Sequence, residues 1–215
     1  VVEIDLSSLA VKHGMSCCTG ITPDATYIVG WYWEYDEANS YFAQQYGAVI
    51  PFCYDVLKDR VTVPVEGERI YNENAATAIK AVAPDRTLLG YQQSQGIHSI
   101  IWADENTPYE YVHFEYNDEY EPLFSLGDTQ NLLSQSGRYI YGKATDFANG
   151  QAVLPAAYDR QTEQLYTFTG GSVSAMSDQG FAFINDSPYY LGTTSYVVDI
   201  TKGEPYEQIP FEEWI

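Results

Sequence analysis

Two segments of the chain combine aromatic rings with carboxylates and contain no lysine or arginine: WYWEYDEANSYFAQQYG (31–47) and HFEYNDEYEPLFSLG (113–127). Aromatic rings stack on the apolar faces of sugars, and carboxylates accept hydrogen bonds from sugar hydroxyls. Tyrosine and tryptophan also dominate the hot spots of protein interfaces, and an acidic surface steers a basic partner toward it. The two segments are therefore candidates for recognition of a glycan or a protein.

The candidate ligand-binding residues in these segments carry an aromatic ring, an imidazole or a carboxylate. They are Trp31, Trp33, Glu34, Tyr35, Asp36, His113, Glu115, Tyr116 and Asp118. A structural interpretation competes with this one: the rings fill the interiors of two loops, and the acids keep the surface solvated. An enzymatic interpretation also stays open, because a pair of carboxylates such as Glu34 and Glu115 could act on a glycosidic bond.

The chain lacks the sequence patterns of common catalytic and cofactor sites, namely GxSxG, GxGxxG, GxxxxGK[ST] and HExxH. Its glycine-rich stretch TGGSVSAMS (169–177) opens a predicted strand, so no helix N-terminus is expected there to bind phosphate. The three histidines, His13, His98 and His113, are isolated in sequence, and the acidic segments lack the ligand spacing of an EF-hand. We therefore expect no catalytic residue, no cofactor and no metal site.

The negative charge of the chain argues against some classes of binding partner. The 215 residues carry a formal net charge of −20, and no lysine or arginine lies between Arg86 and Arg138. Nucleic acids and anionic membranes require a basic surface, so neither is expected as a partner. No window approaches the roughly 18 apolar residues of a membrane-spanning helix, so no membrane insertion is expected. Residue 1 is valine, so we expect any targeting signal to lie upstream. No pattern predicts the oligomeric state.

The three cysteines, Cys17, Cys18 and Cys53, lack the CxxC spacing of a zinc or redox site. We interpret them as small buried hydrophobic residues. The alternative is a disulfide that joins Cys17 or Cys18 to Cys53.

An internal repeat predicts the elements that would position the two segments. Its four copies are ITPDATYIVG (21–30), VAPDRTLLG (82–90), LSQSGRYIYG (133–142) and MSDQGFAFIN (176–185). Each copy opens with an apolar residue, continues with residues that tight turns select, and ends in an alternating apolar strand. The second copy is one residue shorter in its turn, and the fourth has Asn185 where the others close on glycine. Each copy predicts a strand, a short hairpin turn and a second strand.

A second pair of strands is predicted after every copy. The segments are VIPFCYDVLKDRVTVPV (49–65), HSIIWADENTPYEYVHF (98–114), AVLPAAYDRQTEQLYTF (152–168) and SYVVDITKGEPYEQI (195–209). The repeating unit is thus four antiparallel strands at a spacing of 43 to 61 residues, which is typical of β-propeller blades. The predicted fold class is an all-β propeller of four or five such units, with a β-sandwich as the alternative. We expect one propeller domain, or part of one, over residues 1–215, with repeat cores near 18–31, 79–91, 130–143 and 173–186.

The repeat resembles the blade core of bacterial WD40-like and TolB-like propellers. The shared pattern is an apolar residue, Ser or Thr, a turn with Asp or Gly, and then Tyr-Ile-x-Gly, as in residues 21–30 and 133–142. The repeat is also similar to the HAF repeats of extracytoplasmic bacterial proteins. The resemblance implies a propeller fold and an extracytoplasmic setting (periplasmic, cell-surface or secreted), but no reaction.

Together with the two acidic aromatic segments, this resemblance predicts a non-enzymatic module that binds a protein or a glycan. Two alternatives stay open. One is a carbohydrate-active hydrolase or lyase that uses the carboxylates of the segments, and the other is a purely structural module of a larger surface protein.

Overall fold

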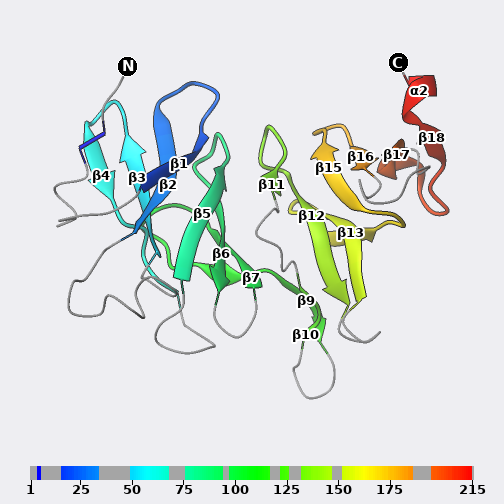
Figure 1. The fold of residues 1–215 in the computed structure, drawn as a ribbon, viewed down its shortest axis with the longest axis horizontal. Coiled ribbons are helices and arrows are strands. Elements are labelled where there is room, and N and C mark those ends of the chain that lie inside the picture. The colour runs from blue at the N-terminus through cyan, green and yellow to red at the C-terminus, as the bar shows by residue number, and fades with distance from the viewer. Residues whose placement is uncertain are drawn as a thin grey trace. The chain divides into compact units, whose positions relative to one another are not determined.

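The computed structural model describes most of the chain, and almost all of that part is β-structure (Figure 1). The described residues are 4–5, 16–33, 49–67, 76–93, 97–116, 122–125, 132–146, 152–185 and 195–214. The chain divides into two compact units, Val1–Tyr111 and Val112–Ile215. Each unit holds two antiparallel sheets.

The first unit holds two four-stranded sheets, which we call blade 1 and blade 2. Blade 1 consists of β1 (Ser16–Ile21), β2 (Tyr27–Trp33), β3 (Val49–Asp55) and β4 (Arg60–Thr62), in that spatial order. Blade 2 consists of β5 (Ala76–Val82), β6 (Leu88–Gln93), β7 (Ile97–Trp102) and β8 (Glu110–Tyr111), also in chain order. Both sheets are antiparallel meanders, as the repeat predicts.

The second unit holds blade 3 and blade 4. Blade 3 contains β9 (His113–Tyr116), β10 (Pro122–Ser125), β11 (Leu132–Leu133), β12 (Tyr139–Asp146), β13 (Ala152–Asp159) and β14 (Gln164–Thr167). Blade 4 contains β15 (Ser172–Met176), β16 (Phe181–Asn185), β17 (Tyr196–Asp199) and β18 (Gln208–Pro210). The 3-10 helix η3 (Ile200–Lys202) precedes β18 and the short helix α2 (Phe211–Trp214) follows it. Among the described residues, no helix is long and apolar enough to cross a membrane.

The hairpin turns of the repeat fall into two lengths. Thr22 N–H donates to the Tyr27 carbonyl, and Ser134 N–H donates to the Tyr139 carbonyl, both at 2.9 Å. The turns of the second and fourth copies are one residue shorter. Their closing bonds run from Ala83 N–H to Thr87 O and from Ser177 N–H to Phe181 O.

The turn length also determines which residue of each copy occupies the position of the closing glycine. The third residue after the acceptor carbonyl of each turn is Gly30, Gly90, Gly142 or Ile184. The pairing of Ile184 with Tyr196 matches the pairing of Gly30 with Phe52. The fourth copy therefore has Ile184, and not Asn185, in place of the closing glycine, because its turn has lost one residue.

Consecutive blades pack against each other within each unit. In the first unit one buried cluster joins blade 1 to blade 2: Tyr27, Val29, Cys53, Ile79, Leu88, Ile100, Trp102 and Tyr109. In the second unit another joins blade 3 to blade 4: Tyr139, Tyr141, Ala157, Phe168, Val173, Met176, Ala182, Ile184, Tyr196, Val198 and Ile200. Four-stranded antiparallel sheets that bury one face against the next sheet in the chain are propeller blades. The predicted all-β propeller fold class is confirmed.

The cysteines depart from the sequence-based interpretation. All three are free thiols, and Cys17 and Cys18 are exposed, whereas Cys53 is fully buried. The interpretation as buried residues is therefore wrong for Cys17 and Cys18, because they lie near the start of β1, the edge strand of its sheet. For Cys53 it is confirmed, and burial raises the pKa of its thiol to about 12.

Candidate functional site

Each blade has two ends, because its antiparallel strands reverse direction at every connection. We call turn end the end that carries the hairpin of the repeat and the connection from the third to the fourth strand. We call loop end the opposite end, which carries the second-to-third connections: residues 34–48, 94–96, 147–151 and 186–195. The described start of segment 31–47, residues 31–33, is therefore at the loop end of blade 1.

The structure places the first candidate residues only in part. Trp31 and Trp33 are in β2, opposite Pro51 and Val49 of β3. The Trp31 side chain is half-buried, and strand alternation places it on the face that Val29 buries against blade 2. The Trp33 side chain lies outside the described residues, as do the whole of Glu34, Tyr35 and Asp36.

The second segment contains two strands that sequence analysis did not predict. His113, Glu115 and Tyr116 belong to β9, which pairs with β10 in an antiparallel ribbon. The side chains of these three residues, and the whole of Asp118, lie outside the described part of the chain. The missed signal was the period of two in His113–Tyr116, which is short and lies among many acids.

The ribbon lies at the loop end of blade 3. β10 pairs with the last two residues of β12, with Phe124 opposite Asp146 and Ser125 opposite Thr145. At the turn end of β12, the short strand β11 pairs with Tyr141 and Ile140 instead. The described residues of the two segments, 31–33, 113–116 and 122–125, thus lie at the loop ends of their own blades. They belong to different units, so their convergence stays a prediction.

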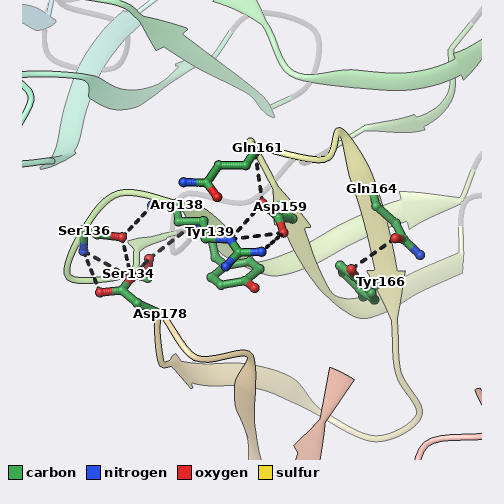
Figure 2. A network of polar contacts seen from close by, with 9 residues as sticks. All are labelled: Ser134, Ser136, Arg138, Tyr139, Asp159, Gln161, Gln164, Tyr166 and Asp178. Atoms are coloured by element: carbon green, nitrogen blue, oxygen red, sulfur yellow. Dashed lines mark hydrogen bonds and ion pairs between the residues drawn. The ribbon is translucent and has the colours of Figure 1, made fainter. Parts of the chain in front are cut away.

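At the turn end, by contrast, charged side chains are paired with one another. In blade 3, Arg138 donates through Nε and Nη2 to the Asp159 carboxylate, with 2.6 Å between Nη2 and Oδ2 (Figure 2). Asp159 is 1% exposed, and its Oδ1 also accepts from Gln161 N–H. Burial alone would raise the pKa of the Asp159 carboxyl, but the bonds from Arg138 and Gln161 hold it below its ordinary value.

The same position in blade 1 is occupied by Asp55, which lies opposite Tyr27 as Asp159 lies opposite Tyr139. Its Oδ2 is 3.0 Å from Lys58 Nζ and 3.3 Å from Arg86 Nη1. Arg86 belongs to the hairpin turn of blade 2, so here the neighbouring blade supplies the arginine.

The two arginines stack in the same way. The Arg86 guanidinium lies 4.6 Å from the centre of the Tyr27 ring, and the Arg138 guanidinium lies 4.8 Å from the centre of the Tyr139 ring. The sequence match between YDVLKDR and YDRQTEQ locates the two aspartates, but not the arginines that pair with them.

The carboxylate of Asp178 links blade 4 to blade 3 through hydrogen bonds. Asp178, in the turn of blade 4, accepts from Ser134 Oγ at 2.6 Å, from Ser136 Oγ at 2.6 Å and from Ser136 N–H (Figure 2). Burial opposes ionisation of Asp178, but these hydrogen bonds lower its pKa below the ordinary value. The bonds hold the turns of two consecutive blades together.

The Asp178→Asn variant is expected to unfold more easily at neutral pH, by about 1–2 kcal/mol, because hydrogen bonds to a charged acceptor are stronger than those to an amide. The folded-state pKa of Asp178 is lowered, so its contribution is complete above the unfolded pKa of roughly 3.9 and is lost as the pH falls through the folded value. Urea unfolding of both proteins between pH 7 and pH 3 tests this. A difference in unfolding free energy that stays constant down to the lowest pH would contradict the assignment.

Basic side chains gather at the turn ends. Of the eight described lysines and arginines, six lie there, with Arg60 as the first residue of β4, and two lie in the interior of strands. The six are Lys58, Arg60, Arg86, Arg138, Arg160 and Lys202, and the two are Lys80 and Lys143. The second-to-third connections at the loop ends contain no lysine or arginine in their sequence, but they do contain Glu34, Asp36, Glu37 and Asp186. These connections therefore carry acidic side chains and no lysine or arginine to balance their negative charge.

Buried polar contacts fix the strand that leads into β9. The Gln92 side chain is fully buried in blade 2, where its Nε2 donates to Tyr109 Oη at 2.9 Å and its Oε1 accepts from Tyr111 Oη. The rings of Tyr109 and Tyr111 meet edge to face, with their centres 5.7 Å apart. Tyr111, which these contacts hold in place, is only two residues before His113, the first residue of β9.

The blades and their two unlike ends define a β-propeller protein, and comparison with solved structures agrees with this class. The chain is similar to an oligogalacturonate lyase solved in complex with manganese, with a TM-score of 0.57 and 15% identity over 92% of this chain and 52% of that one. It is also similar to TolB from Acinetobacter baumannii (TM-score 0.48, 11% identity, 86% of this chain and 40% of that one). A third similar structure is a putative TolB from Agrobacterium tumefaciens (TM-score 0.47, 11% identity, 92% of this chain and 67% of that one).

At these identities the likeness shows the propeller fold alone. The chain spans about 40% to two thirds of the length of these proteins. No family model matches the chain, and no curated protein does. Within the described residues, no group of three or more His, Cys, Asp and Glu side chains could hold a metal ion.

Proposed function

We propose that this chain is a non-enzymatic binding module of the β-propeller type that works outside the cytoplasm and recognises a protein or a glycan. Recognition uses what we call the acidic aromatic rim, formed by the loop-end segments 31–47 and 113–127. Its candidate contact residues are Trp31, Trp33, Glu34, Tyr35, Asp36, His113, Glu115, Tyr116 and Asp118. The extracytoplasmic setting rests on the resemblance of the repeat to TolB-like propellers.

The observation that supports this proposal most is the difference in charge between the turn ends and the second-to-third connections at the loop ends. At the turn ends, aspartates are paired within the molecule. Asp159 forms an ion pair with Arg138, and Asp178 accepts a hydrogen bond from Ser134. Segments 31–47 and 113–127 contain no lysine or arginine that could neutralise their acids in the same way. On a chain of net charge −20, such a surface attracts cationic groups and repels anionic ones.

The aromatic residues of the rim would supply the contact area. Tyrosine and tryptophan are the residues that most often carry binding energy in interfaces, because they bury large rings and keep a polar group at the edge. Carboxylates beside the rings would fix the orientation of a sugar hydroxyl or of a lysine or arginine side chain.

The double variant Trp33→Ala with Tyr116→Ala is expected to weaken binding by roughly 30-fold or more, because loss of two hot-spot rings costs at least about 2 kcal/mol. The measurement is binding of both proteins to a glycan array and to an array of basic peptides. The matched control is Leu57→Ala, which removes a side chain that is 78% exposed at the turn end of blade 1. If the double variant binds as the wild type and the control do, the chain is a structural module.

The second candidate function is a carbohydrate-active propeller, which the likeness of the fold to an oligogalacturonate lyase favours. Its carboxylates would be Glu34, Asp36, Glu115 or Asp118 on the rim. In that case Glu34→Gln or Glu115→Gln would abolish cleavage of an oligosaccharide while leaving its binding nearly unchanged.

A further inference from the structure

Within the described residues, one edge of the strand β9 has no pairing partner. On one side it pairs with β10, with Tyr116 opposite Pro122, Phe114 opposite Phe124 and His113 opposite Ser125. The spatial order of the sheet is β14-β13-β12-β10-β9, so β9 is its last strand, and no described strand pairs with its other side. An open edge presents a row of N–H and C=O groups that can pair with another chain.

The described pairing of the β9–β10 ribbon with blade 3 is short. Among the described residues, the ribbon pairs with the rest of blade 3 through Phe124 and Ser125, which lie opposite Asp146 and Thr145. A two-stranded ribbon is marginally stable by itself, and three or more strands are needed for independent stability. A further strand along β9 would therefore stabilise this part of the molecule.

Most other edges in the described sheets carry features that discourage strand addition. The inner edge strands β1, β5 and β15 each contain a register shift of the bulge type. The outer edge strands β4 and β18 are three residues long and carry Arg60 and Pro210. β8 has only two residues. β9 and β14 each have four residues, no proline, no lysine or arginine, and an unbroken register. They differ in charge, because the turn before β14 contains Arg160, whereas no lysine or arginine lies near β9 in the sequence.

The acidic residues in and near β9 determine which kind of strand would pair with it most favourably. Glu115 lies within the strand, and no lysine or arginine occurs between Arg86 and Arg138. Opposite charges on neighbouring strands stabilise a sheet, and like charges directly opposite one another destabilise it. A basic strand would therefore pair with β9 more favourably than a neutral or acidic one.

We propose that an extended segment of a protein partner, rich in lysine or arginine, adds as a strand to the open edge of β9. The proposal rests on the function proposed above, and it specifies the partner as a protein and the binding mode as β-strand addition. Main-chain hydrogen bonds from β9 give affinity in this mode, and the acidic surroundings give preference for basic side chains.

The probe is a labelled nine-residue peptide of alternating lysine and valine, whose binding to the intact chain is followed by fluorescence anisotropy. Its control has the same sequence with two adjacent central residues N-methylated, which removes one donor from each strand edge and leaves the charge unchanged. We expect the control to bind at least tenfold more weakly. We also expect hydrogen exchange of the amides of 113–116 to slow at least tenfold when the unmethylated peptide is bound.

Equal binding of the two peptides, or no protection of 113–116, would overturn strand addition and leave recognition by charge alone. Glycan binding that is lost in Trp33→Ala, without any binding of the basic peptide, would overturn this proposal and leave the proposed function standing. If the chain binds neither glycans nor basic peptides, both proposals fail.

Discussion

Replacement of Gly30 by alanine is expected to lower the free energy of unfolding by about 3 kcal/mol, because the added methyl group has no room. A Cβ at this position would lie 2.2 Å from the Cys17 carbonyl oxygen and 2.9 Å from the Phe52 ring. The carbonyl is backbone of the neighbouring strand β1, so β1 and β2 would have to move apart. Urea unfolding monitored by tryptophan fluorescence measures the loss.

Two matched variants separate this close approach from the general effect of alanine for glycine. Gly90 has the same position in blade 2, where a Cβ would lie 2.3 Å from the Ala78 oxygen, so Gly90→Ala should lose a similar amount. At Gly20 the nearest atom is Val29 Cγ2 at 3.1 Å, and the backbone atoms are 3.4 Å away, so Gly20→Ala should lose less than about 1 kcal/mol. Equal losses at Gly20 and Gly30 would contradict the steric explanation.

Removal of the Asp159 carboxylate is expected to have the second large effect, a loss of about 2–3 kcal/mol in Asp159→Ala. Breaking a fully buried ion pair by removing one partner costs roughly 3–5 kcal/mol. Here Asp159 is 1% exposed but Arg138 is 31% exposed, so water offsets part of the loss. Thermal and urea unfolding of the variant at pH 7 give the magnitude.

The corresponding aspartate of blade 4 provides the control for Asp159. Asp199 lies opposite Phe181, but its partner Lys202 is 59% exposed and 3.8 Å away. Exposed ion pairs contribute little, so Asp199→Ala should lose only the bonds that Thr201 donates to the carboxylate. A loss at Asp199 as large as that at Asp159 would show that the turn bonds, and not the buried ion pair, account for the effect.

The sequence by itself determined the local elements of this protein. Alternating apolar residues and the turn chemistry of Thr22, Asp24 and their equivalents predict the strands and hairpins, because both depend on neighbours within a few residues. The recurrence of these elements predicts the propeller fold. The net charge and the absence of lysine and arginine from 31–47 and 113–127 follow from the sequence alone, and so does the list of candidate rim residues.

Only the tertiary structure decided which residues meet across the blades. Asp55 pairs with Arg86 of the next blade, whereas Asp159 pairs with Arg138 of its own blade. The repeat pattern treats the two aspartates alike, and the choice of arginine depends on how consecutive blades dock. Docking involves residues far apart in the chain, so no local periodicity contains it.

For the acidic aromatic rim too, part of the description comes from the sequence and the rest from the tertiary structure. The acidic aromatic composition of the two segments could be read directly, but their placement at the loop ends required the order and direction of the strands. The ribbon of β9 and β10, and the open edge of β9, also came only from the strand pairing. Four residues of alternating pattern are too few to predict a strand, and its hydrogen-bonding partner is chosen by the assembled sheet.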